Sequence, residues 1–265
     1  MIPKADIIAW RQIAPWVSDA QVEQDLIITR TLIVIFGDPF LSKELAFRGG
    51  TALHKLYFKT PLRYSDDIDL VQIKSGPIGK ILDTIQTAVN PFLGEPRRKQ
   101  TEETVTLTYR MESEGPPVVP LRLKIEINTR EHFSVLGLRK VLFKIDSRWY
   151  SGSCEITTFS LEELLSTKVR ALYQRRKGRD LFDLWLGLTE GKTDPEKVVE
   201  IFKYYMKSEG SFIDRKQYKS NLEEKMHHPG FIRDLTPLLS PNIEYDSQLA
   251  YSLILKEIVA RMDEV

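Results

Sequence analysis

The chain has 265 residues, of which 42% are hydrophobic and 28% charged, a composition typical of a globular protein with one large or two smaller domains. The formal net charge is +1, which excludes uniform attraction to nucleic acid, although residues 97–99 and 175–179 are local basic clusters. A single cysteine excludes an internal disulfide framework, and no apolar run reaches the roughly 20 residues of a membrane span. With no signal-peptide pattern at the start, these features favour a cytoplasmic protein.

In chain order, the first strong pattern is a helix that begins after a cap at Ser18-Asp19 and ends at Gly37. A short strand over 44–48 runs into Gly49 and Gly50, and residues 51–58 have helical character. Residues 67–73 are rich in β-forming side chains and predict a strand. A helix is expected over 78–93, followed by extended segments over 104–111, 119–128, 139–145 and 154–159.

From Ser160 onward the pattern is helical, beginning with a capping box formed by Ser160 and Glu163. Helices are expected over 160–176, 179–191, 195–208 and 247–262. The sequence therefore predicts two domains, one of mixed helices and strands over 1–158 and a helical one over 159–265.

The first candidate site is the turn Gly49-Gly50-Thr51 between a strand and a helix. Paired glycines let a ligand approach the backbone, and the free N–H groups at a helix start bind anions. The plain alternative is a turn in which Thr51 caps the helix. The turn matches neither the dinucleotide-binding G-x-G-x-x-G spacing nor a P-loop.

The second candidate site is the acidic run Asp66, Asp67 and Asp69. Residues two apart on a strand share a face, so Asp67 and Asp69 should lie side by side, with Asp66 on the opposite side. Neighbouring carboxylates repel unless a cation lies between them, and Mg²⁺ prefers such oxygen ligands. A solvated strand end is the plain alternative. Glu126, on the charged face of the segment 119–128, becomes a third ligand if the two strands are neighbours.

This combination resembles the nucleotidyltransferase toxins of the AbiEii/AbiGii type, which belong to the DNA polymerase β-like superfamily. The segment "GGTALHKLYF…RYSDDIDL" is similar to the first family motif, and "KIEIN" is similar to the second, with Glu126 as its acidic residue. The segment "TKVRALYQRRKGRDLFDLW" is similar to the third and fourth, with Lys168 and Asp183 as the matching residues. The similarity covers residues 47–185, roughly the central half of the chain.

The resemblance implies an α+β fold, with a polymerase β-like core of mixed sheet and flanking helices and a C-terminal helical bundle. It implies an NTP substrate, Mg²⁺ held by Asp67, Asp69 and Glu126, and catalytic roles for Asp67, Asp69, Lys168 and Asp183. The nucleotide would contact Gly49, Gly50, Thr51, Ser65 and Arg179. Without the resemblance, Lys168 with Asp180 and Asp183 could equally be a surface ion pair between two helices.

The leading hypothesis is thus a Mg²⁺-dependent nucleotidyltransferase toxin that transfers a nucleotide from an NTP to an acceptor hydroxyl and releases pyrophosphate. The resemblance implies RNA, such as the tRNA 3′ end, as acceptor and a separately encoded antitoxin as partner, with no membrane association. Two alternatives stay open: a transferase that modifies protein hydroxyls, and a non-enzymatic module that binds nucleic acid or a protein partner.

Overall fold

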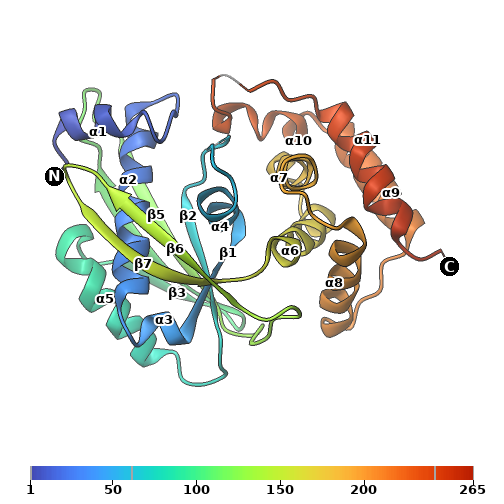
Figure 1. The fold of residues 1–265 in the computed structure, drawn as a ribbon, viewed down its shortest axis with the longest axis horizontal. Helices are drawn as coiled ribbons and strands as arrows, with labels where there is room; N and C mark the ends of the chain where they lie inside the picture. Colours follow the sequence, from blue (N-terminus) through green and yellow to red (C-terminus); the bar gives the residue numbers. More distant parts are fainter. Residues whose placement is uncertain (1, 61, 242, 265) are drawn as a thin grey trace. The chain divides into compact units, whose positions relative to one another are not determined.

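The computed structural model describes residues 2–60, 62–241 and 243–264 (Figure 1). The chain divides into two compact units, Met1–Phe159 and Ser160–Val265. None of the helices in the described part of the chain is long and apolar enough to cross a bilayer.

The first unit is built on one mixed sheet of seven strands, in the order β3-β4-β5-β2-β1-β7-β6. The strands are β1 (Leu45–Arg48), β2 (Asp67–Gln72), β3 (Arg97–Gln100), β4 (Thr104–Glu112), β5 (Pro120–Asn128), β6 (Arg139–Asp146) and β7 (Ser151–Thr158). β2 runs parallel to β5, and β1 parallel to β7, whereas the other neighbours are antiparallel. The helices are α1 (Lys4–Trp10), α2 (Asp19–Gly37), α3 (Leu41–Glu44), α4 (Gly49–Leu56) and α5 (Gly79–Leu93).

The central strands have one apolar face and one polar face. Ile68 and Leu70 on β2 and Leu123 and Ile125 on β5 are buried, and α2 and α5 pack on β5 and β4 from this side (Figure 1). Helix α4 packs against β1 and β2. Burial of these alternating aliphatic side chains favours the observed register, because a slip by one residue would expose them all. The charged residues of β2 and β5 therefore share the other face.

Arg30, the charge that interrupts the longest apolar run, is enclosed by aromatic rings in the first unit. Its guanidinium carbon lies 4.1 Å from the ring centre of Phe92, 4.8 Å from Trp149 and 5.0 Å from Tyr150. Burial lowers the pKa of Arg30. Arg30 is half-buried, and its cation–π contacts join α2, α5 and the β6–β7 turn, so the charge stabilises the fold.

The second unit is helical. It contains α6 (Leu161–Gln174), α7 (Gly178–Thr189), α8 (Pro195–Ser208), α9 (Arg215–Met226), α10 (Pro229–Arg233), α11 (Ser247–Glu257) and two short 3₁₀ turns, Thr236–Leu238 and Val259–Arg261. Helix α6 packs on α7 and α8, and α7 packs on α11. An α+β fold with a mixed sheet, flanking helices and a following helical region is confirmed.

The predicted capping box at the start of α6 is only half formed. Ser160 accepts a hydrogen bond from the backbone N–H of Glu163, as expected. The Glu163 side chain, instead of returning to the backbone of Ser160, accepts a hydrogen bond of 3.0 Å from the Tyr205 hydroxyl. Glu163 is fully buried, and this bond to α8 satisfies one of its oxygens.

Candidate active site

Two carboxylates project from the polar face of β2, as the alternation of the strand predicts. Asp67 and Asp69 are partly exposed, whereas Ile68 between them is fully buried. On the parallel neighbour β5, Lys124 lies opposite Asp67 and Glu126 lies opposite Asp69. Directly paired residues point to the same side of a sheet, so all four charges share one face. The condition that the sequence left open, adjacency of the two acidic strands, is met.

Glu126 is oriented by one cation and one hydroxyl on its own face. Its carboxylate lies 2.6 Å from Lys124 Nζ and 3.5 Å from Thr106 Oγ1 on β4. No group of three or more His, Cys, Asp or Glu side chains within the described ranges is placed closely enough to hold a metal ion. Glu126 is thus in register with Asp69 but is neutralised by Lys124.

Asp67 carries the observation that best fits a missing cation. Its Oδ1 atom is buried and has no hydrogen-bond partner among the described residues. Burial raises the pKa of Asp67 to about 7, with further contributions from Asp66 and Asp69, while Lys124 and Arg122 only partly offset this effect. A half-buried carboxylate beside two others costs free energy when charged, and a divalent cation would remove that cost. The donor set of Asp67 and Asp69 therefore fits Mg²⁺.

The glycine turn lies against this acidic face. Gly49 has a φ of +81°, and a Cβ atom on it would lie only 2.1 Å from Asp69 Oδ2. Asp69 is consequently packed against the amino end of α4, where the helix dipole favours negative charge. A Cβ on Gly50 would lie 2.4 Å from a guanidinium nitrogen of Arg63. Gly49 is required by its positive φ and by the close approach of Asp69, and a side chain at Gly50 would displace the end of the Arg63 side chain; sequence reasoning had attributed both glycines to a ligand.

Thr51 and Ser65 connect this turn to the start of β2. The Thr51 hydroxyl lies 2.8 Å from Ser65 Oγ and 2.5 Å from the carbonyl oxygen of Asp67. Thr51 is 1% exposed. Because these bonds already use the Thr51 hydroxyl, only the backbone of the turn can offer donors to an anion.

Gly49→Ala is expected to destabilise the protein by about 1–3 kcal/mol from backbone strain alone, because alanine is strained at this positive φ. Its Cβ would also displace the Asp69 carboxylate, which adds to the loss. Gly79→Ala is the control, since a Cβ at Gly79, the first residue of α5, meets nothing within 4 Å. Urea unfolding of both variants measures the effect. Equal stability of the two would show that the turn rearranges at no cost.

Lys168, the predicted phosphate-binding lysine, lies in a buried charge cluster within the second unit. Its Nζ is 3.0 Å from Asp180 Oδ1 and 2.9 Å from Asp183 Oδ2. Arg175 forms a bidentate ion pair with Asp180, with N···O distances of 2.7 and 2.8 Å. Burial would raise the pKa of Asp180, but Lys168 and Arg175 together lower it. The alternative of a surface ion pair is wrong, because Lys168 is 6% exposed and both aspartates are fully buried.

Arg179, a predicted nucleotide contact, is held by Asp234 in the second unit. Its Nε lies 3.0 Å and its Nη2 3.2 Å from the two carboxylate oxygens, and its backbone N–H also donates to Asp234. Burial opposes the charge of Asp234, but Arg179 and Lys177 lower its pKa below the usual value. These bonds fix the start of α7.

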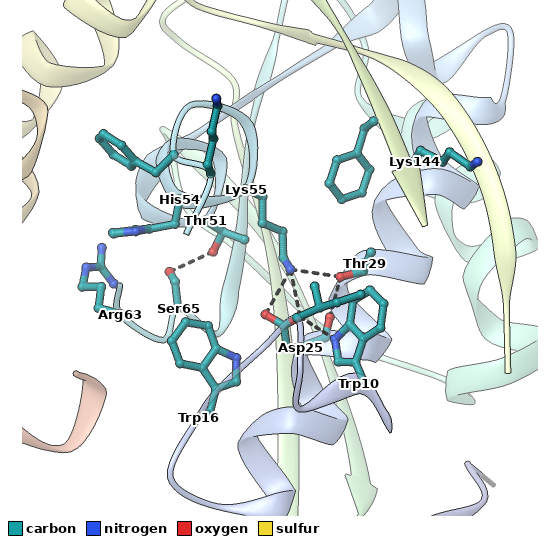
Figure 2. Close-up of a pocket in the computed structure, with 14 residues that line it drawn as sticks. Trp10, Trp16, Asp25, Thr29, Thr51, His54, Lys55, Arg63, Ser65 and Lys144 are labelled. Atoms are coloured by element: carbon teal, nitrogen blue, oxygen red, sulfur yellow. Dashed lines mark hydrogen bonds and ion pairs between the residues drawn. The ribbon is translucent and has the colours of Figure 1, made fainter. Parts of the chain in front are cut away.

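Sequence reasoning missed a cavity of about 150 Å³ in the first unit, on the side of α4 that Thr51, His54 and Lys55 face (Figure 2). Lys55 Nζ lies 3.0 Å from both carboxylate oxygens of Asp25, and Trp10 Nε1 donates to the same carboxylate. The cavity is lined by residues from α1, α2, α4, β6 and two loops, and by none of Asp67, Asp69 and Glu126. No local motif could reveal it, because its walls come from separate segments.

A family model described as "Nucleotidyl transferase AbiEii toxin, Type IV TA system" matches residues 31–257. The chain belongs to this family. It is therefore a nucleotidyltransferase, and membership implies an NTP substrate and an antitoxin partner. The alternative of a non-enzymatic binding module has no support.

Solved structures share the fold of this AbiEii-family protein at low sequence identity. The nucleotidyltransferase toxin MenT4 of Mycobacterium tuberculosis H37Rv is 14% identical, with a TM-score of 0.65 over 99% of this chain and 91% of that one. JHP933 of Helicobacter pylori is 18% identical, with a TM-score of 0.56 over 92% and 95% of the two chains. A putative nucleotidyltransferase of H. pylori is 17% identical, with a TM-score of 0.53 over 94% and 100%. No curated protein matches the chain significantly.

Proposed function

We propose that this AbiEii-family enzyme transfers a nucleotide from an NTP to a hydroxyl of RNA, such as the tRNA 3′ end, and releases pyrophosphate. The acceptor hydroxyl attacks the α-phosphorus, the bond to the bridging oxygen breaks, and pyrophosphate carries away the electron pair. Because NTP and tRNA are cytoplasmic, the reaction belongs in the cytoplasm.

The residues of the acidic face have different roles in this reaction. Asp67 and Asp69 would hold Mg²⁺. Glu126 would be the third ligand, and the ion would take the place of the Lys124 ammonium beside it. When bound, the ion supplies positive charge that stabilises the attacking and leaving oxygens. The Asp67 carboxylate lies on the same face and would also accept the proton of the attacking hydroxyl. The backbone N–H groups of Gly49–Thr51 would orient the triphosphate.

Lys168 and Asp183 take their proposed roles from the family motifs: Lys168 binds phosphate oxygens, and Asp183 orients the lysine. The ion pair of 2.9 Å between them supports the second role. Arg179 and Ser65 are proposed as further nucleotide contacts. The single observation that best supports the whole proposal is the buried, unpartnered Oδ1 of Asp67 on a face shared with Asp69 and Glu126.

Incubation of the pure protein with each α-labelled NTP, Mg²⁺ and total tRNA tests the proposal. Label is expected on RNA with at least one NTP and is expected to be absent with Asp69→Asn or with EDTA. Label on protein in place of RNA would favour the protein-modifying alternative. Absence of both labelled products and of pyrophosphate with every NTP would contradict the proposal.

A further inference from the structure

The polar face of the sheet continues past the carboxylates to the edge strand β3. One row of directly paired residues runs Asp69, Glu126, Thr106, Lys99, and the next runs Asp67, Lys124, Thr108, Arg97. Arg110 and Arg122 are paired with each other farther along β4 and β5, on the same side. Both rows thus begin at the acidic pair and end at a cation.

Four of these cations are free to bind a partner. Arg97, Lys99, Arg110 and Arg122 are exposed. None of the four forms an ion pair with another residue in the described part of the chain. The two threonines between them, Thr106 and Thr108, are partly exposed; Thr108 can donate a hydrogen bond to a ligand, whereas the Thr106 hydroxyl lies 3.5 Å from Glu126. We call these six residues of β3, β4 and β5 the basic strip.

Arg98 shows that the strip has only one side. It is paired with Leu107, whose side chain is buried on the apolar face, and it donates a hydrogen bond of 2.7 Å to Gln100 on its own side. Arg98 therefore points away from the strip, although it is exposed and lies between Arg97 and Lys99. The cluster of residues 97–99 is divided by the strand between two faces.

We propose that the basic strip binds the phosphate backbone of the RNA acceptor and leads its reactive end to Asp67 and Asp69. This inference rests on the proposed function and adds the surface that holds the substrate. Unpaired cations with interspersed hydroxyl donors complement a polyanion of repeating phosphates. The three strand spacings from β2 to β3 measure about 14 Å, a distance that a few nucleotides can cover. An exposed β-sheet face is an established platform for single-stranded nucleic acid.

The test is the affinity of the full chain for fluorescently labelled total tRNA, measured by anisotropy at several salt concentrations without NTP. Arg97→Gln is expected to weaken binding severalfold, whereas Arg98→Gln, the same charge change at the next residue, leaves it unchanged. A variant with Arg97, Lys99, Arg110 and Arg122 all changed to Gln is expected to lose at least about tenfold in affinity near physiological salt. Its log–log salt dependence should be less steep by about 3, since each lost phosphate contact on a single strand removes about 0.7.

The outcomes separate this inference from the proposed function. Wild-type affinity and salt dependence in the fourfold variant would overturn the strip, even if the enzyme labels RNA. Equal losses for Arg97→Gln and Arg98→Gln would also overturn it, because they would indicate general charge attraction. A loss confined to the strip, together with label found only on protein, would show that the strip binds RNA but that RNA is not the acceptor, which overturns the proposed function. If the protein binds polyglutamate more tightly than RNA, and the same variants lose that binding, the partner of the strip is an acidic protein and the inference of RNA is wrong.

Discussion

Asp67→Asn is expected to abolish nucleotide transfer and, at the same time, to stabilise the metal-free protein at pH 8. The first effect follows because the carboxylate is the proposed metal ligand with the unpartnered Oδ1 atom. The second follows because burial and the neighbouring acids Asp66 and Asp69 oppose the charge of Asp67. A residue retained at a cost in stability is characteristic of a functional site.

The sign of the pH dependence follows from the pKa of Asp67, which is about 7 in the folded chain and 3.8 without such surroundings. The folded state therefore holds the proton more tightly than the unfolded state. Metal-free wild-type protein should lose stability as pH rises from about 4 to about 7, and Asp67→Asn should lack this loss. Conversely, stabilisation of the wild-type protein by Mg²⁺ should increase over the same range, because the ion competes with the proton.

Thermal unfolding with and without Mg²⁺ between pH 5 and 8 measures these effects. Asp83→Asn is the control, since Asp83 is exposed on α5, outside the acidic face. It should change neither activity nor the response to Mg²⁺. Lower stability of Asp67→Asn at pH 8 would show that Asp67 has a structural role, and retained transfer would show that the reaction does not need its carboxylate.

Lys168→Met is expected to destabilise the protein by about 3–5 kcal/mol, because it leaves Asp183 buried without its ammonium partner. Asp180 would keep its two bonds to Arg175. The second substitution in Lys168→Met/Asp183→Asn removes the buried charge that faced the lysine and should restore much of the stability. Loss of activity in Lys168→Met alone is therefore not diagnostic, since unfolding produces the same result.

The folded double variant separates the two roles of Lys168. If the lysine binds phosphate, Lys168→Met/Asp183→Asn should show a normal circular-dichroism spectrum and no nucleotide transfer. Full activity in this variant would make the cluster purely structural. Lys203→Met is the matched control in the same unit, because its ion pair with Asp263 is at the surface and should contribute less than about 1 kcal/mol.

Local patterns in the sequence were enough to predict the class of the fold and the order of its main elements. Alternation on β2 and β5 and the helical spacing after Ser160 depend on local burial preferences, which a chain displays directly. The elements β3 and α9 were not predicted because they lack such patterns: every residue of β3 is exposed, and α9 has a polar sequence. Family motifs also named Asp67, Asp69, Glu126, Lys168 and Asp183.

Which of these residues lie next to one another depends on the packing of the folded chain. Parallel pairing of β2 with β5 places Glu126 beside Asp69, and the close packing of Asp69 and Arg63 explains Gly49 and Gly50. Lys168 is buried at the centre of a charge cluster, where a surface ion pair had been an alternative. Strand alternation places Arg97 and Lys99 on one face of the sheet and Arg98 on the other. The physical reason is the same in each case: pairing register and burial arise from contacts between segments far apart in the chain, which local patterns do not encode.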